Sequence, residues 1–587
     1  MIKIKIQLLF MALFGATFSL SAQPALNKAN WQDAGMKSAR PSWSNTVNIL
    51  SFGGDAGGTM PNDAAWSAAL AALGGKPGIV FFPEGKYLFN DNIVLSRDSV
   101  ILKGAGYNKS ALIFDMAGAG KTCIQVTGAA VSADTAYLSA SAQRYQYKLN
   151  AKSALKFKAG DWVLLGMDDK SYFYSSWAYG LLTQTMQLSS VSDTELNFYS
   201  PCRFYYPLSN RPLVKRLLPK QMVGIECLKI QRMDDAAAQT SLVSFDKAVN
   251  CWIEGVETDS GNFAHIAINQ CSNIEVLNSY VHHAFGYGGG GEGYGIVLQS
   301  GSGECRIEGN IFVHLRHSIL LQSAANGNVI GYNYSKDPYW TGTLLPANSA
   351  GDIVLHGNLP YLNLFEGNIN QNTVIDDSHG ANGVFNTFFR NRSEGYGIFM
   401  NSSPYTDSVQ IVGHEITNSI LGLYSVGGAG LLEYSNNVKG TLTPSGTLTL
   451  SVASLYLPSG VKPYCPAAYP VFPAIAYPNV YNMGSNQAKD RFASAKMAVC
   501  SCDELIVGIP EIKPLASITC FPNPFTNELT INCGTESQAV LFVYNALGQR
   551  MYSLPFSGTA KINTLNWPRG MYFLKVDESA SFSLLKE

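Results

Sequence analysis

The sequence predicts an all-β protein whose main part is a parallel β-helix, a solenoid in which each turn of chain stacks on the one before. A four-residue phrase of apolar, any, apolar and polar residues recurs between about residues 246 and 424. Strand-like alternation with a period near 23 residues is typical of such a coil. The closing polar residues, spaced 23, 30, 23, 34, 20, 25 and 23 residues apart, are Asp246, Asn269, Gln299, Gln322, His356, Asp376, Asn401 and Tyr424.

Stacked coils bring residues of one phase into a ladder with rungs about 4.8 Å apart. A second apolar register supports the coil, and we assign to it Ile253, Val276, Ile307, Ile330, Phe365, Phe389 and Val412. Two coils exceed the period, one at the glycine-rich stretch Gly286–Gly293 and one around Trp340. Insertions on one side of a solenoid usually build its binding face. All eight histidines lie between His265 and His414, so we expect the functional site within this repeat.

Composition narrows the class of protein. The 587 residues carry a net charge of −1, and only 14% of them are charged, which gives no basic footprint for nucleic acid. Lys3 and Lys5 precede an apolar run, and small residues follow it, so residues 1–22 are predicted to be a secretory signal peptide cleaved after Ala22. No later stretch reads as a stable membrane span. Cys251 and Cys305 share one phase of the repeat and are expected to be buried in the core.

The first coils carry specific phrases. They are Val47–Asp55, Pro61–Asp63, Gly78–Tyr87 and Ile101–Gly106. This segment resembles the N-terminal part of the pectate lyase superfamily, which also contains rhamnogalacturonases and epimerases. The resemblance implies a right-handed parallel β-helix over residues 23–502, with a helix that caps the first coil. The sequence departs from the superfamily at Gly53–Gly57 and Asn62–Asp63, both in the cap, where the chain must cover the open edges of the first coil.

Residues 125–222 interrupt the period and are predicted to form a small inserted β subdomain. Strand-like segments lie around Trp162 and Leu196. Aromatic residues gather between them and either stack on sugar rings or pack the insert against the coil: Tyr172, Phe173, Tyr174, Trp177 and Tyr179.

The C-terminal end is predicted to be a separate β-sandwich domain, residues 517–587, after a linker at 503–516. Its phrases are Phe521–Pro524, Glu528–Ile531, Leu541–Gln549 and Trp567–Val576. They closely resemble the C-terminal sorting domain of the type IX secretion system of Bacteroidetes-like bacteria. The resemblance implies export through the periplasm, contact with the secretion machinery and a secreted or cell-surface location. A generic carbohydrate-binding sandwich is the alternative.

A β-helix with this resemblance is expected to act on an extracellular polysaccharide, and two reactions compete. Inverting hydrolysis needs two carboxyl groups about 6.5–9.5 Å apart. The centre of the ladder offers a single carboxylate, Asp376, and its neighbour Asp377 faces the opposite side if both lie on one strand. This favours β-elimination on a uronate-containing chain over a hydrolase of the polygalacturonase or rhamnogalacturonase type. A non-catalytic glycan-binding surface protein is the third alternative.

Elimination needs a cation at the sugar carboxylate, a base for the C5 proton and a group that protonates the leaving oxygen. We expect His356 or His317 to be the base and Asp376 to orient it. One arginine is expected to neutralise the carboxylate, with Arg390 and Arg392 both pointing outward if Phe389 and Asn391 point inward. The complete set of candidate catalytic residues is Arg316, His317, His356, Asp376, His379, Arg390 and Arg392.

Three further interpretations concern polar residues of the coils. The series Asn310, Asn333 and Asn368 is expected to be a structural hydrogen-bonding ladder. Some lyases that resemble this protein use calcium, for which the candidate ligands are Asp376, Asp377 and Asp352. His282 and His283 are adjacent on one strand, so their side chains are expected to diverge and to make a poor metal pair.

Overall fold

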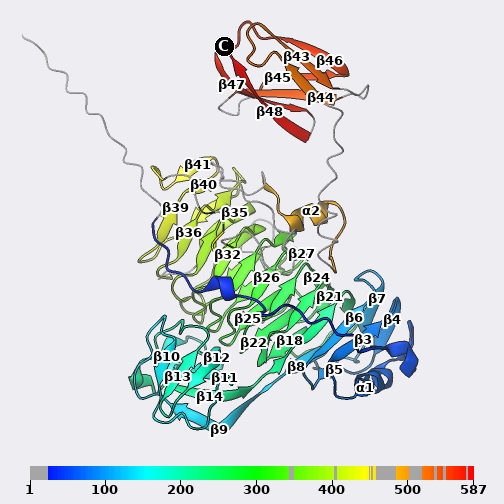
Figure 1. Ribbon diagram of the computed structural model, residues 1–587, viewed down its shortest axis with the longest axis vertical. Coiled ribbons are helices and arrows are strands. Elements are labelled where there is room, and N and C mark those ends of the chain that lie inside the picture. The colour runs from blue at the N-terminus through cyan, green and yellow to red at the C-terminus, as the bar shows by residue number, and fades with distance from the viewer. Residues whose placement is uncertain are drawn as a thin grey trace, which may run out of the picture. The chain divides into compact units, whose positions relative to one another are not determined.

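The structure is a computed structural model. It describes residues 24–342, 349–401, 406–447, 450, 452, 454–457, 484–500, 518–533, 539–545, 550–576 and 579–587. The predicted signal peptide and the predicted linker lie outside these residues. The chain divides into two compact units, residues 1–504 and 505–587. Figure 1 shows the first unit as a stack of parallel strands in successive coils.

One sheet of the β-helix contains twelve of the described strands, each from one coil and paired in parallel. They are β1 (Thr46–Asn48), β3 (Gly78–Phe82), β6 (Val100–Gly104), β16 (Val223–Glu226), β20 (Trp252–Glu254), β23 (Glu275–Leu277), β26 (Arg306–Glu308), β29 (Val329–Gly331), β32 (Leu364–Glu366), β34 (Thr387–Phe389), β36 (Gln410–Val412) and β39 (Leu432–Tyr434).

The second sheet consists of two neighbouring columns of strands that stack from coil to coil. The column that includes β21 and β24 comes first: β2 (Gly57–Pro61), β4 (Gly85–Phe89), β7 (Ser110–Phe114), β17 (Lys229–Arg232), β21 (Glu257–Gly261), β24 (Tyr280–Ala284), β27 (Ile311–Val313), β30 (Tyr334–Lys336), β37 (Glu415–Ile416), β40 (Asn436–Val438) and β41 (Thr441–Thr443). The column that bears the polar ladder is β5 (Ile93–Leu95), β8 (Ile124–Thr127), β18 (Ser241–Asp246), β22 (Ala264–Asn269), β25 (Tyr294–Gln299), β28 (His317–Leu321), β31 (Ile353–Leu355) and β38 (Leu423–Ser425). β33 (Ile369–Ile375) and β35 (Arg392–Met400) span both columns.

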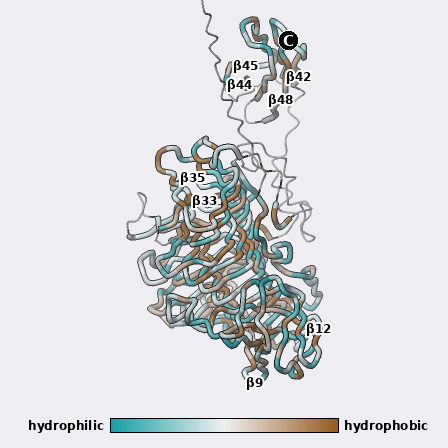
Figure 2. Tube along the Cα trace, turned by 90° about the vertical axis from the view of Figure 1, so that its left-hand side faces the viewer, coloured by the Kyte–Doolittle hydropathy of each residue, from teal (hydrophilic) through white to brown (hydrophobic). Residues whose placement is uncertain are grey.

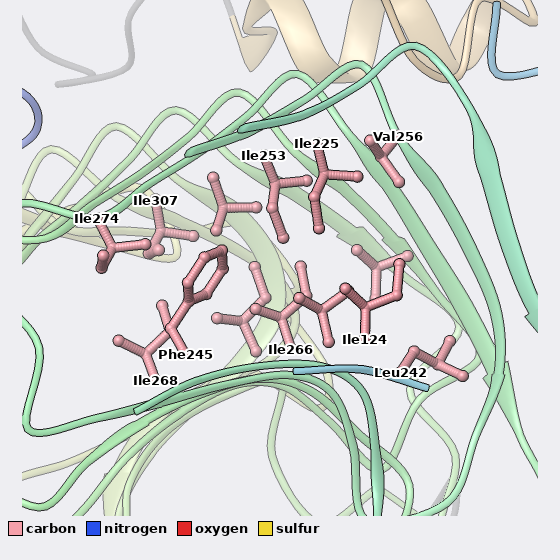
Figure 3. Packing of buried hydrophobic residues seen from close by; sticks show 14 of the residues in the cluster. Ile124, Ile225, Leu242, Phe245, Ile253, Val256, Ile266, Ile268, Ile274 and Ile307 are labelled. Atoms are coloured by element: carbon pink, nitrogen blue, oxygen red, sulfur yellow. The ribbon is translucent and has the colours of Figure 1, made fainter. Parts of the chain in front are cut away.

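The interior of the coil is a continuous apolar core. Figure 3 shows Ile225, Ile253 and Ile307 of the first sheet facing Phe245 and Ile266 of the second. Figure 2 shows hydrophobic and hydrophilic residues alternating along the coils. At about 25 cal/mol per Å² of buried apolar surface, such stacking is the main force that holds consecutive coils together.

The first coil is closed by helix α1 (Asp63–Ala72), whose Trp66 and Ala69 are buried in the core. The helix therefore covers the apolar interior that an uncapped solenoid would expose. A second helix, α2 (Gln487–Ala493), packs Phe492 against Tyr334 of β30. The described structure also has short 3₁₀ helices at Trp31–Asp33, Ile49–Phe52, Lys170–Tyr172, Ser176–Ala178 and Leu208–Asn210.

The polar ladder has the predicted register through its centre. Asp246 pairs with Asn269, and Asn269 with Gln299. The last repeat differs from the prediction, because Tyr424, which was assigned to the position of Asn401, pairs with Ile398, three residues earlier.

The second apolar register keeps its spacing to the end, but its last two predicted residues were wrong by one position. Phe365 pairs with Phe388, and Phe388 with Ile411, so these residues and not Phe389 and Val412 face the core of the coil. The physical reason is that Phe389 and Val412 are buried in a second apolar cluster outside the coil, with Trp31 and Leu455, so apolar character alone did not distinguish the two faces of the strand.

Buried asparagines fix how the coils stack, which confirms their structural interpretation. The side-chain amide of Asn310 donates to Asn333 Oδ1 over 3.0 Å, and that of Asn333 donates to Asn368 Oδ1 over 2.9 Å. Asn368 continues the series to Asn391 over 2.8 Å. Cys251 and Cys305 are also buried as predicted.

The insert forms its own antiparallel sheet within the first unit. Its six described strands are β9 (Ala129–Tyr137), β10 (Lys148–Asn150), β11 (Trp162–Gly166), β12 (Gln184–Val191), β13 (Glu195–Phe198) and β14 (Leu213–Leu218). A short pair, β15 (Lys220–Gln221) and β19 (Ala248–Val249), follows it. Arg203 anchors the insert to the coil, because its buried guanidinium donates to Glu304 over 2.8 Å and to Asn326 over 2.6 Å.

The second unit contains two antiparallel sheets around one apolar core that includes Phe525, Leu541 and Tyr572. The three-stranded sheet holds β42 (Ile518–Phe521), β43 (Glu528–Cys533) and β46 (Gly558–Asn563). The four-stranded sheet holds β44 (Ala539–Asn545), β45 (Arg550–Phe556), β47 (Gly570–Val576) and β48 (Ser579–Lys586).

Candidate functional site

A pocket of about 750 Å³ lies over the outer face of the ladder column, where the insert and the glycine-rich loop meet the coil. The insert contributes Trp177 and Leu181, and the loop contributes Gly290 and Gly291. The remaining lining residues are Thr122, Gln239, Ser241, Ser244, Phe263, Ala267, Asn269, Tyr294, Gln299, Ser300, Arg316, Gln322, His356 and His379. None of the described lining residues is an aspartate or a glutamate.

The floor of the pocket is the polar ladder. Gln322 donates from its side-chain amide to Gln299 over 2.6 Å, and Gln299 donates to Asn269 over 2.8 Å. These amides leave a row of uncharged polar groups along the stacking direction. The next rung is His356, where the chemistry of the ladder changes.

Three side chains gather at this end of the pocket. Nε2 of His356 and Nδ1 of His379 each lie 3.6 Å from Oδ2 of Asp376. The two imidazole rings stack with their centroids 4.5 Å apart. His379 extends toward solvent with a side chain that is 46% exposed, whereas the side chain of His356 is only 14% exposed. The structure therefore brings together three of the predicted site residues around one carboxylate.

The charge states of this group follow from its surroundings. Burial lowers the pKa of His356 to about 4, although Asp376 opposes the shift. Burial alone raises the pKa of Asp376, but its interactions with His379, Ser378 and His356 outweigh this and hold the pKa below its usual range. At neutral pH the group therefore combines an ionised carboxylate with a neutral His356, whose free electron pair can accept a proton.

Arg316 supplies a cation in the pocket. Its guanidinium lies 5.4 Å from the ring centre of Tyr294 and 5.8 Å from that of Trp340. Nη1 donates to the carbonyl oxygen of Gly288 in the glycine-rich loop over 2.6 Å. Its positive charge is among the causes that lower the pKa of His356. The cation and the neutral histidine are thus electrostatic neighbours.

Tyr294 is a site residue that sequence reasoning missed. It lines the pocket under Arg316, is 4% exposed, and has a pKa raised by burial. It stands opposite His317 in the neighbouring strand, two positions before Ile296 as His317 is before Ile319. The equivalent positions of Tyr294 and His317 in their repeats were the sequence signal that could have identified Tyr294.

His317, the alternative base, lies behind the pocket. It is 3% exposed, and its Nδ1 donates to the carbonyl oxygen of Gly351 over 2.8 Å. Burial lowers its pKa well below the ordinary value. Its ring centre is 5.9 Å from that of His356. His317 therefore supports the group and does not line the pocket.

Arg390 and Arg392 do not join this group, so neither is placed to neutralise a sugar carboxylate in this pocket. Arg390 is buried, and its guanidinium donates to the carbonyl oxygens of Leu450 and Val452. Arg392 forms ion pairs with Glu394 over 2.8 Å and with Glu415 over 2.9 Å. Arg390 directly follows β34 of the first sheet, and Arg392 begins β35 in the column beside the ladder, so neither lies over the ladder column.

The three candidate calcium ligands do not converge. Asp352 is fully buried and accepts hydrogen bonds from Ser335 and from the backbone of Gln371, and burial raises its pKa to about 6. Asp377 accepts from Asn382 and from the backbone of Thr406. Only Asp376 faces the pocket group. Donor atoms of Asp376, His356 and His379 lie within 4.8 Å of one another, a spacing that suits a nitrogen-preferring ion better than calcium.

The aromatic residues of the insert differ in their surroundings. Phe173 is buried in the insert core, with Tyr172 packed against it. Trp177, which is 52% exposed, lines the pocket, while Tyr174 and Tyr179 are exposed.

Fold and site together define a β-helix protein with a polar, cation-bearing pocket outside its coil. Residues 46–147 match the family described as rhamnogalacturonase A/epimerase, pectate lyase-like, and residues 519–586 match the secretion system C-terminal sorting domain. The first match supports a polysaccharide-active protein. The second indicates export by the type IX system to the cell surface or the extracellular space, and hence interaction with that machinery. No helix in the described ranges has the length and apolar character to cross a membrane.

None of the curated proteins matches the chain. Similar solved structures include the tailspike gp61 of Pseudomonas phage phi297, with 15% identity and a TM-score of 0.47 over 68% of this chain and 75% of that one. The mannuronan C-5 epimerase AlgE6 A-module of Azotobacter vinelandii has 14% identity and a TM-score of 0.34 over 67% of this chain and 99% of that one. The catalytic unit of a GH87 α-1,3-glucanase from Streptomyces thermodiastaticus has 13% identity and a TM-score of 0.32 over 69% and 66%.

Proposed function

We propose that the protein is a secreted polysaccharide lyase that cleaves uronate-containing chains by β-elimination in this pocket. The observation that carries the proposal is the composition of the lining: Arg316 beside the neutral His356, with no carboxylate among the described lining residues. A pocket with a cation and uncharged polar groups favours an acidic sugar. Two-carboxylate hydrolysis requires a pair of acids that this lining does not offer.

Each residue then has a role. The Arg316 guanidinium pairs with the sugar carboxylate, which acidifies the adjacent C5 proton and stabilises the charge that develops there. His356 accepts that proton. Its place near Arg316 suits the role, because the C5 proton is next to the carboxylate. Asp376 faces Nε2 of His356 and stabilises the imidazolium that forms.

The C5–H electrons form the C4–C5 double bond, the C4–O bond breaks, and the leaving oxygen takes a proton. Tyr294 is the group that we propose donates it, since its phenol lies in the same pocket and burial keeps it protonated. The amide ladder and Trp177 hold the neighbouring sugars.

The test is to incubate the mature protein with a panel of pectic, alginate-like and other acidic polysaccharides. A lyase produces unsaturated ends that absorb ultraviolet light. New reducing ends without that absorbance would favour the glycoside hydrolase, and glycan binding without either signal would favour the surface adhesin. His356→Ala is expected to abolish product formation while its melting temperature stays within a few degrees of wild type.

A further inference from the structure

A second group of metal-ligating side chains lies outside the pocket, on the neighbouring column of the second sheet. It comprises Asp259 of β21 and the adjacent pair His282 and His283 at the end of β24. Candidate donor atoms of all three lie within 4.8 Å of one another. The proposed lyase chemistry uses none of them.

The two histidines converge, contrary to the expectation that they diverge. Nδ1 of His282 lies 2.8 Å from Nδ1 of His283. The backbone explains this: His283 has a φ of 58°, which departs from strand geometry and turns its side chain back toward its neighbour. The carbonyl oxygen of His283 accepts a hydrogen bond from the buried His265 over 2.7 Å, which fixes the unusual conformation.

The surroundings of His282 determine which of its ring nitrogens carries the proton and which carries the lone pair. Nε2 of His282 faces Oε1 of Glu257 at 3.2 Å, and Glu257 is paired with Lys229 at 3.0 Å. A carboxylate that holds one ring nitrogen in its protonated form leaves the lone pair on the other, which is how proteins orient histidine ligands. This leaves Nδ1 as the acceptor nitrogen of His282, in hydrogen-bond contact with Nδ1 of His283 and with Oδ1 of Asp259 3.7 Å away.

Charge is compatible with a cation here. Lys229 binds the other oxygen of Asp259 over 2.8 Å and leaves Oδ1 on the histidine side. Two carboxylates, Glu257 and Asp259, exceed the single ammonium by one negative charge. His283 is exposed, so the group is open to solvent.

We propose that Asp259, His282 and His283 form a binding site for a divalent transition metal of the zinc class, with a position left open to solvent. Two imidazole nitrogens and one carboxylate oxygen are a donor set that such ions prefer over calcium or magnesium. Glu257 is a positioning residue that fixes His282. This site is distinct from the group around Asp376.

The site adjoins a functional element of the fold. The glycine-rich loop begins three residues after His283, and its Gly288 carbonyl accepts the hydrogen bond from Arg316. His314, whose ring lies 5.2 Å from that of His283, also packs against Tyr287 of the loop. A bound ion therefore anchors the start of the loop that forms one wall of the pocket.

The experiment measures zinc binding to the mature protein, stripped with a chelator, by competition with a chromogenic chelator and by metal analysis after dialysis. His283→Ala and Asp259→Asn are expected to weaken the site by more than about 100-fold, and Glu257→Gln by about 10–100-fold. The matched control is Asp376→Asn, which disrupts the other group and is expected to leave this site unchanged.

Either of two results would overturn the proposal: no tight zinc in the wild-type protein, or zinc that survives His283→Ala and Asp259→Asn but is lost in Asp376→Asn. The melting temperature of each variant, measured without metal, distinguishes loss of a ligand from loss of fold. Because binding is read directly, the outcome is independent of whether the pocket is a lyase.

Discussion

Replacing the uncharged Asn333 by leucine should lower the free energy of unfolding much more than a substitution on the surface does. Asn333 lies in the chain between Arg316 and His356, where it helps to fix the register of coils that carry the site. Its side-chain oxygen accepts from the backbone N–H of Asn310 over 2.9 Å and from the Asn310 side chain over 3.0 Å. Its amide donates to Asn368 Oδ1 and to the carbonyl oxygen of Ile307, both over 2.9 Å.

The magnitude follows from these four buried bonds. At about 1 kcal/mol net for each bond, their loss costs about 4 kcal/mol. Most of this loss arises at the backbone N–H of Asn310, because the substitution removes its acceptor. The side chain of Asn310 keeps its hydrogen bond to the carbonyl oxygen of Val276. Because 1.4 kcal/mol is a factor of ten, local opening becomes about 1,000-fold more frequent.

Hydrogen exchange followed by mass spectrometry, with denaturant unfolding of the same sample, measures this directly. Exchange protection around Asn310 should fall by about three orders of magnitude in Asn333→Leu. The control is Asn108→Leu at an exposed position, which should change stability by less than about 0.5 kcal/mol. A change in Asn333→Leu no larger than that of the control would refute the account of the ladder.

Three further predictions concern the site and the pH dependence of stability. Asp376→Asn should lower kcat by about 100-fold or more with little change in KM, because it removes the charge that orients His356; equal losses of binding and turnover in steady-state kinetics would argue against this role. Trp177→Ala should raise KM about fivefold with kcat retained, as expected for about 1 kcal/mol of stacking, and an unchanged KM would place the substrate elsewhere. Burial lowers the pKa of His414 to about 3, so the unfolded chain takes up its proton near pH 6.5 and the folded protein does not. Stability should therefore fall as the pH drops from 6.5 toward 3, with His414 contributing about 1.4 kcal/mol per pH unit, and His414→Gln should show a shallower slope in denaturant titrations.

Periodicity alone predicted the coil, the polar ladder and the change in its chemistry at His356 and Asp376. These depend on side-chain phase, which a regular strand preserves over many residues. The errors fall where both faces of a strand are apolar or where the backbone leaves the strand region. Phe388 faces the core of the coil and Phe389 a second apolar cluster, which the sequence did not distinguish, and a positive φ at His283 turned two histidines toward each other.

Contacts made by long insertions were also beyond prediction. The sequence placed the glycine-rich loop on the coil, but not its carbonyl bond to Arg316. Tyr294 was missed because it directly follows that loop, where the repeated phrase has not yet begun. Trp177 reaches the pocket from the insert, about 180 residues before His356, and no local pattern links them.

The most direct test of the proposed elimination is to run the reaction on an acidic polysaccharide in water enriched in oxygen-18. The masses of the released oligosaccharides are then measured by mass spectrometry. Elimination breaks the C4–O bond without adding water, so the new unsaturated ends should be lighter than hydrolysis products by one water and free of the label. Saturated products that gain one water per cleaved bond, with its oxygen-18 at the new reducing end, would contradict the proposal and show that this pocket hydrolyses its substrate.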